Sequence, residues 1–240
     1  MKVFITGSSD GLGQLAAIDL IKQGHQVVFH ARNEKRSQQV RLKIPKANQV
    51  LLADLSSITE TKILASEVNK IGVFDAIIHN AGVFSGSENQ IFMVNCLAPY
   101  ILTSLIKKPQ RLIYISSGMH LQGVPNLKNI SRGINYSDSK FYLLLLSMAV
   151  ARKWPKVYSN TVNPGWVPTK MGGAHAPDNL QKGVDTQVWL AVSDDEKATV
   201  SGKYFFHQQE AYFNREVLDT NLQDKFLEVC EEISGVHLPD

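Results

Sequence analysis

The chain has 240 residues, of which 44% are apolar, and this fits one large soluble domain with its own core. The formal net charge is +3 and no basic run exceeds two adjacent residues, which excludes the charge pattern of a nucleic-acid or anionic-membrane binder. No stretch is typical of a membrane span or a signal peptide, and two cysteines, Cys96 and Cys230, fit free thiols in a reducing compartment. We therefore expect a cytoplasmic protein without nucleic-acid or membrane partners and without a metal site.

The first element is a short strand followed by a glycine-rich turn. The β-branched and aromatic run Val3–Thr6 precedes Gly7, Gly11 and Gly13, and helical periodicity begins at Leu15. Glycines let main-chain amides approach a ligand closely, and together with a helix N-terminus they form an anion site suited to a pyrophosphate. The spacing G-x-x-x-G-x-G differs from the common G-x-G-x-x-G pattern. It predicts a dinucleotide-binding loop, with an ordinary tight turn as the alternative.

The second predicted strand, residues 26–30, ends where a dinucleotide would place its adenosine ribose. An acidic residue at this point would bind the ribose hydroxyls and repel a 2′-phosphate, but the sequence has Ala31, Arg32 and Asn33. The guanidinium of Arg32 favours a 2′-phosphate, and hence NADP(H), with NAD(H) still possible. Arg32 as a solvated loop charge is the alternative, and Asp10 in the glycine loop opposes the phosphate assignment.

The remaining elements alternate between strands and helices at the spacing of crossover units. Strands are predicted at 49–53, 74–79, 111–115, 157–162 and 202–206, and helices at 34–42, 59–71, 89–106, 136–154, 178–192 and 219–234, with a loop at 119–133. Nearly continuous apolar strands indicate burial on both faces. We predict an α/β fold, in which residues 1–240 form a single Rossmann-like doubly wound domain with about seven parallel strands and helices on both faces.

Polar clusters follow several of these strands. Asp54, Asn80, the pair Ser116–Ser117 and the segment Asn163–Gly165 each come directly after an apolar run. In doubly wound sheets the ligand lies at the carboxyl ends of the strands, so these clusters are expected to converge on one site.

Tyr136 and Lys140 open a long apolar helix and lie four residues apart, which places both side chains on one helical face. A neighbouring ammonium favours the phenolate and would lower the tyrosine pKa toward neutrality. The pair therefore suits transfer of a proton to or from an alcohol or carbonyl oxygen. An ordinary surface pair is the alternative that the spacing alone leaves open.

Over essentially its whole length the chain resembles the short-chain dehydrogenase/reductase family. The motifs that carry the resemblance are Thr6-Gly7-x-x-x-Gly11-x-Gly13, Asp54-Leu55, Asn80-Ala81-Gly82, Asn95, Ser117, Tyr136-x-x-x-Lys140 and Pro164-Gly165-x-Val167-x-Thr169. They occur in the family's order and on the expected elements. Three further features are similar to the retinol-dehydrogenase-like branch of the family. They are the run Gly202–Phe205, the ending near Val236 and the 19-residue spacing from Ser117 to Tyr136.

The resemblance implies a role for each matched residue. Tyr136 would be the general acid or base, Lys140 would lower its pKa and hold the nicotinamide ribose, Ser117 would bind the substrate oxygen, and Asn95 would hold a water in a proton relay. Adjacent strand residues point to opposite faces, so only one of Ser116 and Ser117 can face the ligand. The family position assigns this role to Ser117 and leaves Ser116 a structural role. The implied cofactor-binding residues are Gly7, Ser9, Gly11, Leu12, Gly13, Arg32, Asp54, Leu55, Asn80, Ala81, Gly82, Tyr136, Lys140, Pro164, Gly165, Val167 and Thr169.

On the substrate side the candidates are Met119, His120 and Trp166, with a mobile lid at Lys170–Pro177. A solvated histidine and a tryptophan packed under the loop are the alternatives. Family members usually dimerise or tetramerise through the helices that follow Asn89 and Tyr136, so we expect a homodimer or homotetramer. The apolar run Leu143–Leu146 fits such an interface or deep core.

These features predict an NADP(H)-dependent oxidoreductase that interconverts a small-molecule carbonyl and alcohol by hydride transfer. The alternative is a catalytically silent, dinucleotide-sensing protein of the same fold. Sugar-nucleotide epimerases are disfavoured, because those relatives have a larger C-terminal substrate domain.

Overall fold

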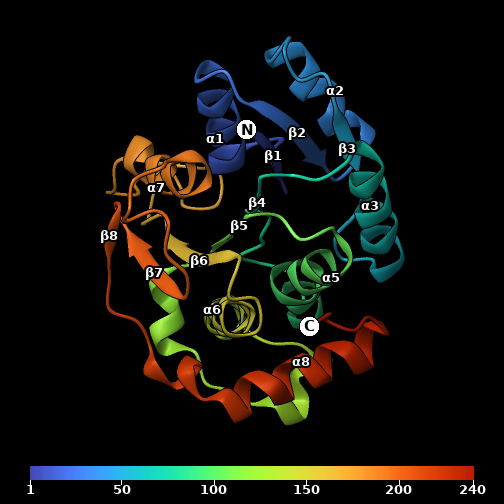
Figure 1. Ribbon diagram of the computed structural model, residues 1–240, viewed down its shortest axis with the longest axis vertical. Coiled ribbons are helices and arrows are strands. Elements are labelled where there is room, and N and C mark those ends of the chain that lie inside the picture. Colours follow the sequence, from blue (N-terminus) through green and yellow to red (C-terminus); the bar gives the residue numbers. More distant parts are fainter.

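An eight-stranded sheet runs through the centre of the computed structural model, which describes residues 1–240 apart from the side chains of residues 129 and 131 (Figure 1). The strands are β1 (Lys2–Ile5), β2 (Gln26–Ala31), β3 (Val50–Leu52), β4 (Ala76–His79), β5 (Arg111–Ile115), β6 (Tyr158–Asn163), β7 (Lys203–Phe206) and β8 (Gln209–Glu210). They lie in the order β3-β2-β1-β4-β5-β6-β7-β8. Neighbouring strands from β3 to β7 pair in parallel, and β8 pairs with β7 in the antiparallel sense.

Helices cover both faces of this sheet. They are α1 (Gly11–Lys22), α2 (Glu34–Lys43), α3 (Ile58–Ile71), α4 (Glu88–Phe92), α5 (Ala98–Leu105), α6 (Tyr136–Lys153), α7 (Leu180–Val192) and α8 (Thr220–Ser234). In Figure 1, α1 and α7 lie on one face and α3, α5 and α6 on the other, and each layer encloses its own apolar core. The predicted doubly wound α/β fold is confirmed. None of the helices in the described chain is long and apolar enough to cross a membrane.

Three local features differ from the sequence-based expectation. The predicted helix 89–106 is broken into α4, a π-helical turn at Met93–Leu97, and α5. The predicted loop 119–133 contains two 3₁₀ turns, Gly118–Gln122 and Leu127–Arg132. Strand β8 was not expected, because the hairpin that creates it turns through His207 and Gln208 at φ of 49° and 61°. Two-residue hairpin turns of this kind normally carry Asn or Gly, so the sequence holds no signal for it.

Helix α6 starts where its sequence supplies a cap. The Asn135 side chain accepts a hydrogen bond from the amide of Asp138 at 2.9 Å, which makes Tyr136 the first helical residue. Pro155 lacks an amide hydrogen, and the helix ends at Lys153 just before it. The cap therefore fixes the position of Tyr136 at the end of α6 nearest the carboxyl ends of β4 and β5.

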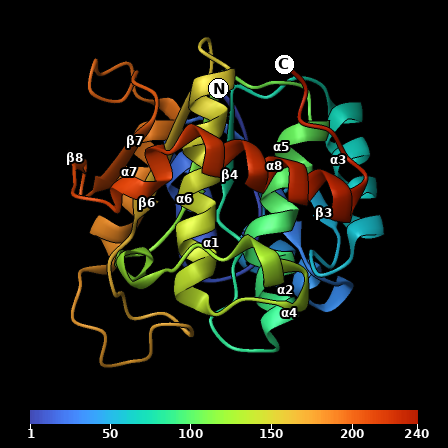
Figure 2. The ribbon, with the colours of Figure 1, turned by 90° about the horizontal axis from the view of Figure 1, so that it is seen from below.

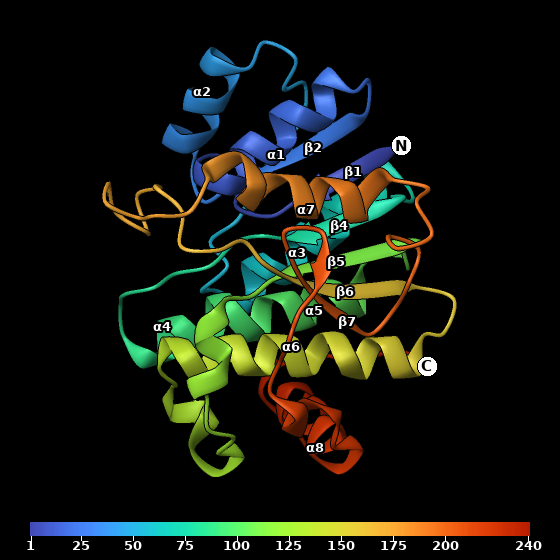
Figure 3. The ribbon, with the colours of Figure 1, turned by 90° about the vertical axis from the view of Figure 1, so that its left-hand side faces the viewer.

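The C-terminal helix α8 forms an additional layer outside α6. Figures 2 and 3 show α8 crossing α6 on the side that faces away from the sheet. The Phe226 ring of α8 stacks on Tyr142 of α6, with ring centroids 5.0 Å apart, and both side chains are fully buried. Cys96 and Cys230 are buried, free thiols in the same core.

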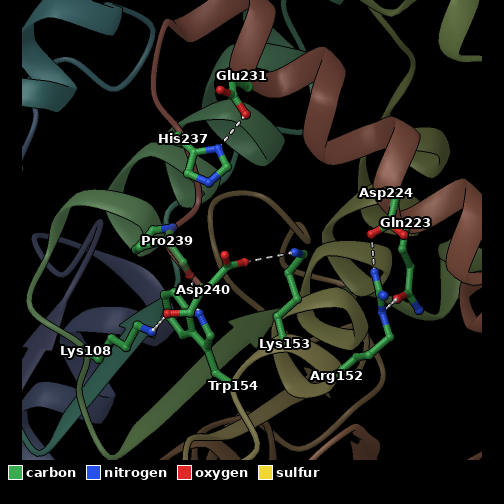
Figure 4. Close-up of polar contacts among 10 residues, drawn as sticks. All are labelled: Lys108, Arg152, Lys153, Trp154, Gln223, Asp224, Glu231, His237, Pro239 and Asp240. Atoms are coloured by element: carbon green, nitrogen blue, oxygen red, sulfur yellow. Dashed lines mark hydrogen bonds and ion pairs between the residues drawn. The ribbon is translucent and has the colours of Figure 1, made fainter.

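The last residues continue across the end of α6 (Figure 4). The Trp154 indole donates a hydrogen bond to the main-chain oxygen of Pro239 at 2.6 Å, and Lys153 forms an ion pair with Asp240 at 3.5 Å. Lys108 donates to the main-chain oxygen of Asp240 and lies over the Trp154 ring. The ordered tail therefore joins the end of α6 to the loop after α5.

Candidate active site

A cleft of about 920 Å³ opens at the carboxyl ends of the central strands. It lies where the strand order reverses between β1 and β4, the usual ligand position in doubly wound sheets. The expected cofactor residues lining it are Gly7, Ser9, Gly11, Leu12, Arg32, Asp54, Leu55, Asn80, Ala81, Gly82, Tyr136, Lys140, Pro164, Gly165, Val167 and Thr169. The structure therefore brings together sixteen of the seventeen residues proposed from sequence.

Gly13, the remaining expected cofactor residue, has a different place. A Cβ atom at Gly13 would lie 2.3 Å from the Asn80 side-chain nitrogen, so Gly13 packs behind the loop. The Asn80 amide in turn donates to the main-chain oxygens of Thr6 and Gly7 at 3.0 and 3.2 Å. Gly13 thus makes room for the side chain that holds the glycine loop against β4, and its expected contact with the cofactor is corrected to this indirect role.

His30, at the end of β2, supports the same loop. Its Nδ1 accepts a hydrogen bond from the Gly7 amide at 2.9 Å, and its Nε2 donates to the Ala53 carbonyl at 3.0 Å. These two bonds require the neutral imidazole. Burial lowers the pKa of His30 to about 4, which keeps it neutral at physiological pH. This role was not predicted, because it depends on three segments, at Gly7, His30 and Ala53, that meet only in the fold.

The Arg32 end of the cleft adjoins a smaller basic cavity of about 500 Å³. Its lining residues are Ser9, Asp10, Arg32, Asn33, Lys35, Arg36, Gln39, Lys43 and Lys170. Asp10, the carboxylate expected to oppose a phosphate, is paired with Arg36 at 3.2 Å and with Lys170. Burial would raise the pKa of Asp10, but hydrogen bonds from Lys170 and the Gly11 amide outweigh it and lower that pKa. The negative charge of Asp10 is therefore offset, and the cavity as a whole is cationic.

Tyr136 and Lys140 lie side by side in the cleft, as their spacing predicted. The Lys140 ammonium is 5.4 Å from the Tyr136 ring centroid and donates a hydrogen bond to the Ile115 carbonyl at 2.7 Å. Burial lowers the pKa of Lys140 to about 8. Burial also raises the pKa of Tyr136 to about 12, against the opposing effect of a hydrogen bond with Ser117. The expected lowering of the tyrosine pKa is therefore not seen, because desolvation of the phenolate is the larger effect.

The two serines after β5 have separate roles. Ser116 Oγ donates to the Lys140 carbonyl at 2.9 Å and is buried against α6. Ser117 Oγ accepts from the Met119 amide at 3.2 Å, and its hydroxyl is near enough to Tyr136 to oppose the rise in the tyrosine pKa. Ser117 is therefore the serine placed to share a ligand oxygen with Tyr136, while Ser116 fixes the helix that carries Lys140.

The side chain of Asn95 lies in the π-helical turn and is fully buried. Its oxygen accepts from the Val83 amide at 2.8 Å, and its nitrogen donates to the Val83 carbonyl and to Ser139 Oγ, each at 2.9 Å. These bonds use both amide hydrogens, so the structure gives the Asn95 side chain the role of holding the segment after Gly82. A water held beside Lys140 stays a prediction.

His120 was expected to face the substrate, and the structure corrects this. It is fully buried, where its Nδ1 donates to the Ser117 carbonyl at 2.7 Å and its Nε2 accepts from the Asn214 amide at 3.3 Å. Its ring also packs on Tyr204, with centroids 4.7 Å apart. His120 therefore supports the Ser117 segment from behind, by connecting it to the chain that precedes α8.

Met119 and Trp166, the other two substrate candidates, do line the cleft. Met171, in the expected substrate-side loop Lys170–Pro177, lines it as well. The sequence-based predictions did not include the lining side chains Val83, Phe84, Gln90, Val94 and Phe206. The Phe84 ring packs edge-on against Tyr136, with centroids 4.8 Å apart. The position of Phe84 two residues after the Asn80-Ala81-Gly82 motif was the only available signal, since apolar residues on short loops otherwise suggest ordinary packing.

The family model described as short chain dehydrogenase matches residues 1–180. The chain is 40% identical to an uncharacterized oxidoreductase of Emericella nidulans, with 100% of this chain and 99% of the relative covered. The chain belongs to the short-chain dehydrogenase family. It is also 40% identical to the short-chain dehydrogenase chyC of Penicillium rubens, with 99% of both chains covered.

This short-chain dehydrogenase is an oxidoreductase of the retinol-dehydrogenase-like branch, and it is 27% identical to retinol dehydrogenase 14 of Mus musculus over 98% of this chain and 86% of the relative. Among solved structures, an uncharacterized protein of Mycobacterium paratuberculosis superposes with a TM-score of 0.83 at 20% identity, covering 100% of this chain and 95% of that one. The NADPH-bound carbonyl reductase from chicken fatty liver gives 0.69 at 19% identity, covering 88% and 98%. These likenesses support the fold.

Proposed function

We propose that this short-chain dehydrogenase is an NADP(H)-dependent enzyme that interconverts a carbonyl and an alcohol by hydride transfer. The observation that carries the proposal is the meeting of Ser117, Tyr136 and Lys140 at one point of the cleft. The cleft fits a dinucleotide, since the glycine loop and the start of α1 line one end of it. Main-chain amides at such a position can bind a pyrophosphate. NADPH, when bound, would supply the hydride.

The chain's own groups would handle the proton and the substrate oxygen. Ser117 would donate a hydrogen bond to the carbonyl oxygen, and Tyr136 would transfer its hydroxyl proton to that oxygen as negative charge develops. Burial raises the pKa of Tyr136 to about 12, so its hydroxyl is protonated at neutral pH and has a proton to donate. The Lys140 ammonium is close enough to stabilise the phenolate that remains.

The preference for NADP(H) is supported by the cationic cavity beside Arg32. Its side chains Arg32, Lys35 and Lys43 gather at the position expected for the adenosine ribose, while Arg36 and Lys170 offset Asp10. A 2′-phosphate carries negative charge that this cavity would bind and that NADH lacks.

A fluorescence titration with NADPH and NADH, followed by a panel of carbonyl compounds, tests the proposal. We expect tighter binding of NADPH, turnover of at least one carbonyl, and at least a hundredfold loss of kcat in Tyr136→Phe with NADPH binding retained. Arg32→Ala should weaken NADPH by about tenfold and leave NADH nearly unchanged, with Lys46→Ala, outside the cavity, as control. Tight NADPH binding without turnover of any carbonyl would instead support the dinucleotide-sensing alternative.

A further inference from the structure

The part of the cleft beyond Tyr136 is walled by aromatic rings and thioethers. Phe84, Trp166 and Phe206 line it together with Met119 and Met171. Phe84 and Trp166 are 50% and 60% exposed, although both are large apolar side chains. A flat apolar ligand that covers such exposed rings removes their surface from water, which makes binding more favourable.

Charged groups near this wall are already engaged. Asp178 accepts a hydrogen bond from the Trp166 amide at 2.6 Å, and Lys170 pairs with Asp10. Lys140 is the remaining cation at this end, and it is directed to the Ile115 carbonyl and Tyr136. Within the described residues, no cation at this end of the cleft is thus left free to bind a carboxylate or phosphate on the substrate.

One amide interrupts the apolar wall. Gln90, on α4, lines the cleft, and within the described part of the chain its side chain makes no hydrogen bond. It lies against Gly86, where an added Cβ would be 2.4 Å from the Gln90 oxygen, so the glycine leaves room for the amide beside the loop. A polar group on the substrate can therefore exchange hydrogen bonds with Gln90 without displacing another partner.

We propose that the substrate is an uncharged, planar aromatic carbonyl compound, and that Gln90 selects those with an amide-like group away from the reacting carbon. This inference rests on the proposed function for the identity of the reacting end. The aromatic wall sets the shape of the substrate, the missing cation excludes anionic substrates, and the Gln90 amide sets the polar position.

The test uses three acetophenones that differ only at the para position, namely methyl, carboxamide and carboxylate, together with cyclohexyl methyl ketone. We expect kcat/KM with NADPH to be at least tenfold higher for the carboxamide than for the carboxylate. Gln90→Leu should lower the ratio of kcat/KM for the carboxamide to kcat/KM for the methyl compound about tenfold. The control is Asn89→Leu, at the neighbouring residue outside the cleft lining, which should leave this ratio unchanged. Phe84→Leu should lower the ratio of kcat/KM for the methyl acetophenone to kcat/KM for cyclohexyl methyl ketone.

Binding of the same four ketones to the enzyme–NADPH complex, followed by NADPH fluorescence, separates this inference from the proposed function. If the affinities follow the order expected for kcat/KM but no ketone is turned over, the inferred substrate preference is supported and the proposed reaction is refuted. Turnover without any preference, a preference for the carboxylate, or an unchanged ratio in Gln90→Leu would overturn the inference and leave the reaction intact. Failure of all four ketones to bind at millimolar concentration would also overturn it.

A second observation concerns the face on which the family resemblance predicted contacts between subunits. The outer side of α5 and α6 is already covered by residues 220–240 of the same chain (Figures 2 and 4). Leu143–Leu146 are at most 1% exposed within one chain. The Tyr100 hydroxyl of α5 donates to the Val236 carbonyl at 2.7 Å, and Leu238 is buried. The apolar run is therefore core in this chain.

The outward side of α8 is unsuited to replace the covered face. Asn221, Lys225, Glu228 and Glu232 are exposed along it, so the new surface is polar and charged. Stable homodimer interfaces are instead markedly apolar at their centre. We infer that the protein is a monomer, in which residues 220–240 occupy the face that the resemblance assigned to a second copy.

Light scattering coupled to size-exclusion chromatography tests this inference on the full chain. A monomer mass between about 1 and 100 µM is expected, and a dimer in the low micromolar range would refute it. Leu238→Asp should detach the tail and give dimers or aggregates, whereas the exposed control His237→Ala stays monomeric. Should Leu238→Asp fail to fold, the wild-type mass alone still decides.

Discussion

Acidification should destabilise the protein through His30, the imidazole between the glycine loop and β3. Its pKa is about 4 in the folded chain, compared with 6.5 for a free histidine. Between these values the unfolded chain binds a proton that the folded chain does not. Stability therefore falls as the pH drops below 6.5, and the loss is complete near pH 4.

The size of this effect follows from the two pKa values. Each pH unit in this window costs about 1.4 kcal/mol, so a shift from 6.5 to about 4 corresponds to about 3 kcal/mol in total. Between pH 6.5 and 5 the loss from His30 should be about 2 kcal/mol. The fully buried His79, with a pKa lowered by burial to about 3, adds a loss of the same sign.

The variant His30→Asn isolates the contribution of His30. The asparagine oxygen can replace Nδ1 as acceptor for the Gly7 amide, but it does not titrate. Urea unfolding of both proteins at pH 7.5, 6.5, 5.5 and 5.0 gives the difference in their free energies of unfolding. That difference should be constant above pH 7 and shrink by about 1.4 kcal/mol per unit below 6.5. Parallel pH profiles for the two proteins would refute the reasoning.

Three further changes should act through packing or hydrogen bonding. Gly13→Ala places a Cβ against Asn80, so the free energy of unfolding should fall by about 1–3 kcal/mol and NADPH should bind more weakly in the same titration. Phe226→Ala removes the ring stacked on Tyr142 and should cost about 3–5 kcal/mol in urea unfolding, against about 0 for the exposed Lys225→Ala. Ser139→Ala removes the acceptor of the Asn95 amide and should cost about 1–3 kcal/mol, and an unchanged denaturation midpoint would contradict this.

The sequence predicted those parts of the fold and site that depend on neighbours along the chain. The glycine loop, the Tyr136–Lys140 pair and the strand ends are local patterns, and they converge because parallel strands bring their carboxyl ends to one edge. The roles of His30 and Phe206 were not predicted, because they arise from contacts between segments far apart in sequence. Local patterns also do not distinguish a residue that lines a cleft from one that packs behind it, which explains the errors at Gly13 and His120.

The same limit applies to Leu143–Leu146. A helix that is apolar on several faces must be enclosed, but its sequence does not reveal whether a second copy or its own chain encloses it. Only the positions of Phe226, Val236 and Leu238 over α6 and α5 distinguish the two cases.

The position of the β7–β8 hairpin has a consequence for how this enzyme can change. Phe206 lies directly before its turn, near the edge of the sheet, while Ser117, Tyr136 and Lys140 belong to central elements. An edge hairpin can be lengthened, shortened or substituted without disturbing the pairing of β4, β5 and β6. Substitutions in this hairpin and at Phe84 would therefore remodel one wall of the cleft and leave Ser117, Tyr136 and Lys140 in place.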